Sequence, residues 1–138
     1  MKIIVLGAGL VGGPMALDLA KDSKFDVAIA DINPATLLAV EQRWKSLSVK
    51  GFQTGKPLQT IRQDLSDPAQ VTQLVSDFDM AVNAVPGFMG FRTLNAILEA
   101  GKNAVDIAFF IEDPFELDDL AKRKGVTAIM DMGVAPGM

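Results

Sequence analysis

Residues 3–12 read Ile3-Ile4-Val5-Leu6-Gly7-Ala8-Gly9-Leu10-Val11-Gly12, an apolar run followed at once by the pattern G-x-G-x-x-G. The run is typical of a buried strand, and the residues after it continue with helical spacing. The first glycine permits a tight turn, the second lets a pyrophosphate approach the backbone, and the third lets the helix pack on the strand. The helix start offers free N–H groups to phosphates. The stretch therefore predicts a Rossmann-type dinucleotide site, with cofactor contacts from Gly7, Gly9, Leu10, Val11 and Gly12.

An acid stands where the second strand of such a fold would end. Asp31 closes the apolar run of residues 28–30, nineteen residues beyond Gly12. An acid at this place accepts hydrogen bonds from the ribose hydroxyls, and its charge would repel the 2′-phosphate of NADP. The next residues, Ile32 and Asn33, supply no arginine for that phosphate. The sequence therefore predicts NAD as the cofactor, with NADP less favoured. The alternative, that Asp31 only caps the next helix, is weaker because Asn33 fills that role better.

The whole chain alternates short apolar runs with helical patterns, which predicts an α/β fold with a parallel sheet. Asx-proline pairs mark three helix starts, and glycines stand where two helices should stop. The expected strands are residues 3–6, 27–30, 60–63, 80–84, 104–108 and 126–130. The helix starts are Asn33-Pro34, Asp67-Pro68 and Asp113-Pro114, and the stops are Gly101 and Gly125. A doubly wound sheet with the strand order 3-2-1-4-5-6 is the expected topology.

The composition limits the classes of function. The chain has 138 residues, 49% of them hydrophobic, which suits one compact domain. Seventeen acidic and thirteen basic residues give a net charge of −4, which argues against nucleic acid or an anionic membrane as a partner. Cysteine, histidine and tyrosine are absent, so thiolate metal sites are excluded and no metal is expected. Glycines interrupt the first apolar run, which argues against a signal peptide and favours a cytoplasmic protein.

Two further turns should lie on the ligand edge of the sheet. Asp64 and Leu65 follow the third strand and are expected near the adenine, and Val85 and Pro86 follow the fourth and are expected near the nicotinamide ribose. For Asp64 an equal alternative is that it helps Ser66 to cap the next helix.

Two acids stand among apolar residues of the last two strands. Asp106 and Asp131 would be costly to bury unless they are partnered or face a site from a strand end. Both are therefore candidate catalytic residues, with a structural role as the alternative.

Four segments together resemble the N-terminal part of the saccharopine dehydrogenase-like family, and within it the lysine 6-dehydrogenases. The first is the glycine motif, which is generic to dinucleotide folds, and the other three are more specific. They are residues 84–91 (AVPGFMGF), 105–110 (VDIAFF) and 130–138 (MDMGVAPGM). Saccharopine reductases are similar in these segments but commonly carry tyrosine at the position of Phe109 and aspartate at that of Ala135, which favours the lysine dehydrogenase branch.

The resemblance implies an oxidoreductase that transfers hydride from the amine-bearing carbon of a lysine-type amino acid to NAD. It also implies that residues 1–132 form the dinucleotide-binding domain. Residues 133–138 would begin a linker into a substrate and dimerisation domain that this chain lacks, so the full-length enzyme is expected to be a homodimer and this chain alone inactive. A saccharopine reductase, a carboxynorspermidine synthase-like member and a non-catalytic NAD-sensing module, as in potassium-transport systems, remain as alternatives.

Overall fold

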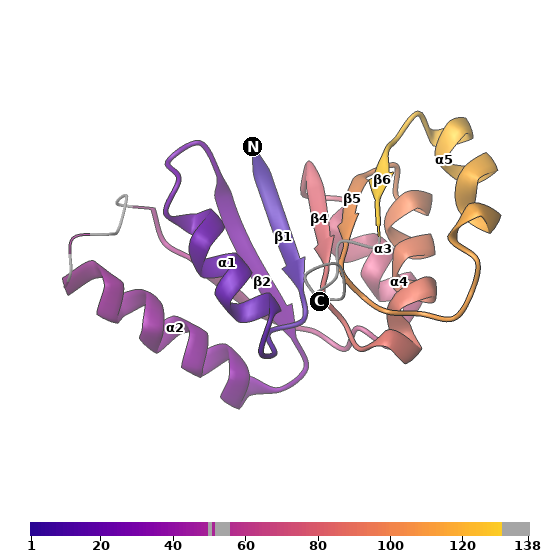
Figure 1. The fold of residues 1–138 in the computed structure, drawn as a ribbon. Helices are drawn as coiled ribbons and strands as arrows, with labels where there is room; N and C mark the ends of the chain where they lie inside the picture. The colour runs from indigo at the N-terminus through magenta and orange to yellow at the C-terminus, as the bar shows by residue number, and fades with distance from the viewer. Residues whose placement is uncertain (50, 52–55, 131–138) are drawn as a thin grey trace, which may run out of the picture.

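The fold is a single parallel sheet with helices on both faces (Figure 1). The computed structural model describes residues 1–49, 51 and 56–130. Its strands pair in the order β3-β2-β1-β4-β5-β6, and every pairing is parallel. The predicted doubly wound topology is confirmed.

The elements follow one another as strand, helix, strand throughout the described residues. The strands are β1 (Lys2–Leu6), β2 (Asp26–Asp31), β3 (Gln59–Arg62), β4 (Met80–Asn83), β5 (Asn103–Asp106) and β6 (Ala128–Ile129). The helices are α1 (Gly12–Ala20), α2 (Pro34–Val49), α3 (Pro68–Val75), α4 (Gly87–Glu99), a 3-10 turn η1 (Pro114–Leu117) and α5 (Asp118–Lys124).

Two hydrophobic layers enclose the sheet. Helices α1 and α2 cover one face, and α3, α4 and α5 cover the other (Figure 1). Alternate residues of β1 divide between the two layers, with Val5 packing toward Trp44 of α2 and Leu6 toward Leu94 of α4. Burial of the central strands on both faces explains why they read as continuous apolar runs.

The three predicted helix starts are confirmed by hydrogen bonds. Asn33 Oδ1 accepts from Ala35 N at 2.9 Å, and Asp67 Oδ1 and Asp113 Oδ1 each accept at 3.0 Å from the N–H two residues on. Gly101 and Gly125 both have positive φ, as expected where a helix stops. The Asx-proline signals therefore mark the starts of α2, α3 and the 3-10 turn η1.

Asp67→Ala is expected to destabilise the domain by about 0.5–2 kcal/mol, because it removes the N-cap of α3. Gln73→Ala, at an exposed position of the same helix, is the control and should change little. Urea unfolding followed by circular dichroism measures both. Equal effects of the two substitutions would contradict the capping role.

Three elements differ most from expectation. Strand β5 ends at Asp106, two residues before the predicted end of that strand at residue 108. The last helix begins as a 3-10 turn that becomes α-helical only at Asp118, because the side chain of Asp113 caps a separate tight turn at Phe115. Strand β6 is limited to Ala128–Ile129, shorter than the predicted 126–130. None of the helices in the described ranges has both the length and the apolar character needed to cross a membrane.

Candidate functional site

The glycine loop between β1 and α1 is shaped by two close approaches. Gly7 has φ +102°, and a Cβ there would stand 2.6 Å from Ala84 O. A Cβ on Gly12 would stand 1.9 Å from Gly7 O, so α1 packs on the loop itself as well as on the strand. Neither position accepts a side chain without moving backbone, and the sequence prediction for both glycines agrees with this geometry.

Gly9 differs from these two glycines because it faces open space. Apart from its two chain neighbours, no atom of the described residues lies within 4 Å of a Cβ built on Gly9. Next to it, Leu10 is 97% exposed, and Val11, the residue before α1, makes no side-chain cap. In the described part of the chain the N–H groups of Leu10 and Val11 donate to no protein atom. The loop thus leaves room for an anion and presents uncommitted donors to it.

Asp31 ties the glycine loop to the turn after β2. Its Oδ2 accepts from Ala8 N at 2.8 Å, and its Oδ1 accepts from Asn33 N at 2.8 Å. An ionised carboxylate has about four acceptor positions, so two such bonds leave capacity for ribose hydroxyls. The carboxylate is therefore held in place by backbone donors at the edge where the sequence predicts the ribose.

A cavity of about 440 Å³ opens beside this loop at the carboxyl ends of the strands. Three strand-to-helix turns and the glycine loop contribute its walls. The lining residues are Gly7, Asp31, Ile32, Asp64, Leu65, Ser66, Val85, Pro86, Phe88 and Met89. The cavity thus brings together Asp31 and all four residues that the sequence predicts near the adenine and the nicotinamide ribose. Which part of a cofactor each of these residues contacts stays a prediction.

Asp64 is committed to a local turn. Its Oδ1 accepts from Ser66 N at 2.9 Å and from Ser66 Oγ at 2.6 Å, and these bonds hold the pKa of the Asp64 carboxyl below its usual value. These bonds close the turn ahead of α3, whose N-cap is Asp67, so the structure shows Asp64 bracing that turn and not capping the helix itself. Because Asp64 also lines the cavity, its prediction as a cofactor contact stays open.

Asp106 lies beneath the site rather than in it. The side chain has no exposed surface, its Oδ1 accepts from Ala108 N at 2.7 Å, and its Oδ2 accepts from Asn83 Nδ2 at 2.7 Å. It is not among the residues that line the cavity. Asp131, the second catalytic candidate, lies outside the described residues. Both remain hypotheses as catalytic residues.

Arg62 is a residue at this edge that sequence reasoning missed. It ends β3 in register with Asp31, and its Nε donates to Ile32 O at 3.2 Å. Ile32 and Asn33, which follow β2 directly in the sequence, supply no cation. The parallel register, which pairs the ends of neighbouring strands, would have pointed to Arg62.

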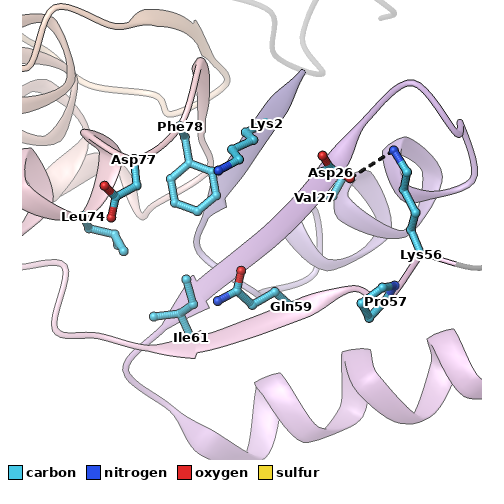
Figure 2. A pocket seen from close by; sticks show the side chains of 10 residues that line it. All are labelled: Lys2, Asp26, Val27, Lys56, Pro57, Gln59, Ile61, Leu74, Asp77 and Phe78. Carbon is cyan, nitrogen blue, oxygen red and sulfur yellow. Dashed lines mark ion pairs between the residues drawn. The ribbon is translucent and has the colours of Figure 1, made fainter.

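A second cavity, of about 390 Å³, lies at the opposite edge of the sheet (Figure 2). It is bordered by the amino ends of the strands, where Lys56 Nζ pairs with Asp26 Oδ1 at 3.0 Å. Ligands of open α/β sheets bind outside the carboxyl ends of the strands. The cavity beside the glycine loop is therefore the candidate cofactor site.

Comparison with known families and sequences finds similarity to the dinucleotide-binding part of saccharopine dehydrogenases. The family model described as "Saccharopine dehydrogenase NADP binding domain" matches residues 3–129. The saccharopine dehydrogenase [NADP(+), L-glutamate-forming] of Pyricularia oryzae is 26% identical over 137 residues, which are 99% of this chain and 28% of that protein. The chain thus spans less than a third of this relative.

Solved structures share the fold at low identity. Apo saccharopine dehydrogenase (L-Glu forming) from Saccharomyces cerevisiae superposes with a TM-score of 0.75 at 17% identity, covering 99% of this chain and 28% of that one. GenD2 from gentamicin A biosynthesis, solved in complex with NAD, gives a TM-score of 0.67 at 17% identity, covering 94% and 33% of the two chains. These likenesses support the Rossmann-like architecture.

Proposed function

Because the chain belongs to the family of saccharopine dehydrogenase NADP-binding domains, we propose that it binds a nicotinamide dinucleotide along the carboxyl edge of its sheet, within an oxidoreductase of amino acids. One observation carries the proposal: the carboxylate of Asp31 is bonded to Ala8 N, which fixes an acid beside a glycine loop with open space at Gly9. A ribose and a pyrophosphate need these two features next to each other.

The finer proposal is a preference for NAD, and it rests on Asp31 alone. The family description and the name of the Pyricularia relative both print NADP, so the comparisons favour the cofactor that the sequence ranks second. No basic residue is among those that line the cavity in the described part of the chain. The nearest cation to the β2–α2 turn that the hydrogen bonds identify is Arg62, which a 2′-phosphate could recruit.

The proposed reaction is oxidation of a lysine-type amino acid by hydride transfer from its amine-bearing carbon. The chain itself would bind the cofactor and hold it still, while a further domain would grip the substrate and carry the homodimer contact. An apolar surface near the proposed nicotinamide end supports such a domain. Phe88 is 79% exposed, Phe109 is 62% exposed and Ile111 is fully exposed, whereas Phe110 packs against Phe91.

The 138-residue chain is expected to bind cofactor but not to oxidise lysine. Positioning the reacting carbon at about 3–3.5 Å from the nicotinamide contributes a large share of an enzyme's rate, and one sheet edge supplies only part of it. NADH or NADPH production at alkaline pH, where the amine is unprotonated, measures turnover. A protein extended to the length of the relatives is the control, and equal turnover by both would contradict the need for a second domain.

A further inference from the structure

The described residues contain three fully buried polar side chains, and two of them form a pair at the ends of neighbouring strands. Asn83 ends β4 and Asp106 ends β5, in register with each other, and both are completely buried. Both point to the same face of the sheet as α4, because Asn83 Nδ2 also donates to Gly90 O at 3.0 Å. Burying a carboxylate costs free energy unless hydrogen-bond donors surround it, so the donors around Asp106 are needed to keep it buried.

The orientation of the Asn83 amide is fixed by its neighbours. Its Nδ2 donates to two acceptors, Gly90 O and Asp106 Oδ2, and a rotated amide would turn its oxygen toward both. Its Oδ1 is buried and has no hydrogen-bond partner in the described part of the chain. An acceptor left unsatisfied carries a cost, which indicates that the bonds on the Nδ2 side are the ones the structure maintains.

These bonds join the first turns of α4 to the segment after β5. Ile107 N donates to Asn83 O at 3.1 Å, which adds a backbone bond to the side-chain pair. A Cβ on Gly87 would stand 1.8 Å from Phe109 O, and a Cβ on Gly90 would stand 2.8 Å from Ala108 Cβ. Helix α4 and residues 107–110 are therefore in direct contact and cannot shift independently.

The β4–α4 turn, through Val85 and Pro86, and the first turn of α4, through Phe88 and Met89, form one wall of the candidate cofactor cavity. We propose that Asp106 is a positioning residue: through Asn83 it holds the β4–α4 turn at the distance that the nicotinamide half of the cofactor requires. This deepens the proposed function and rests on it. It gives Asp106 a role that needs no contact with substrate, consistent with its complete burial.

Asp106→Asn and Asn83→Ala should each weaken cofactor binding about three- to tenfold, the loss expected when one or two buried hydrogen bonds are removed. The double variant should be no weaker than the weaker single variant, because both substitutions break the same link. The control is Ile97→Val, at a buried position in a later turn of α4, which should lower the melting temperature without changing the dissociation constant. Titration of reduced cofactor by its fluorescence, well below each melting temperature, gives the constants.

Unchanged constants in folded variants, or an equal loss in Ile97→Val, would overturn the positioning role while leaving the proposed function intact. Failure of the unmodified chain to bind either dinucleotide would overturn both. Hydrogen exchange on the unmodified chain provides a test that needs no variant. Cofactor should protect residues 85–89 and 107–110 together, and protection of the first segment alone would overturn the proposal.

Discussion

Gly12→Val is expected to unfold the domain, whereas Gly9→Val should leave it folded and remove cofactor binding. The two glycines belong to the same loop, but a Cβ on Gly12 would stand 1.9 Å from Gly7 O, while a Cβ on Gly9 meets no described residue within 4 Å other than its chain neighbours. Overpacking against backbone cannot be relieved by a rotamer change, so its cost exceeds the roughly 1–3 kcal/mol typical of crowded cores. At Gly9 the added side chain would occupy the space proposed for the pyrophosphate.

Circular dichroism and fluorescence titration on the same samples separate the two effects. Gly51→Ala is a control at a glycine away from the site, where a Cβ meets none of the residues that the structure describes within 4 Å but φ is +78°, so only a modest loss of stability is expected. Normal cofactor binding by folded Gly9→Val protein would refute the assignment of the glycine loop as a phosphate site.

The second large effect concerns the choice between NAD and NADP. The unmodified chain should bind NADH more tightly than NADPH, and Asp31→Asn should shift the ratio of the two affinities toward NADPH by about tenfold or more. The reason is that a carboxylate close to a dianionic phosphate costs on the order of 1–4 kcal/mol at a protein surface. Asparagine removes the charge but keeps an oxygen that can accept from Ala8 N.

Arg62→Ala tests whether the chain uses NADP, as the names of its relatives print, or NAD, as Asp31 favours. If the chain uses NADP as its named relatives do, removal of the guanidinium beside Ile32 O should weaken NADPH binding and leave NADH binding unchanged. Glu99→Gln is the control for loss of a carboxylate, because Glu99 is an exposed residue at the end of α4, away from the candidate cofactor cavity. A preference for NADPH in the unmodified chain would show that the Asp31 carboxylate does not face the ribose.

Most elements of the fold could be predicted from the sequence, because the local signals for helices and strands are consistent with a single sheet topology. The Asx-proline starts, the glycine stops and the buried strands each depend on nearby residues, and the right-handed crossover rule then leaves few sheet orders. Gly7, Asp31, Asp64, Leu65, Val85 and Pro86 line one cavity for the same reason, since every βα turn of a parallel sheet reaches that edge. The other predicted contacts, Gly9, Leu10, Val11 and Gly12, do not line this cavity.

Pairings across the sheet were harder to foresee. The local sequence does not predict that Asn83 donates to Asp106, because the two residues lie 23 positions apart and are brought together only by the register of β4 and β5. The same holds for Arg62 and the turn at Ile32, which are 30 positions apart. For a buried acid in a strand, the sequence alone therefore does not distinguish a catalytic role from a structural one, and the residues of the neighbouring strand are needed to decide.

The walls of the cavity beside the glycine loop come from the turns after β1, β2, β3 and β4. A molecule that fills the cavity therefore contacts segments that follow four neighbouring strands of the sheet. A ligand that binds only the assembled sheet favours folding by mass action, by roughly 2.7 kcal/mol at a hundred times its dissociation constant. The population of folded chain would then rise and fall with the supply of dinucleotide. A domain of this size buries only a modest core, so bound dinucleotide would then supply part of the free energy that keeps it folded.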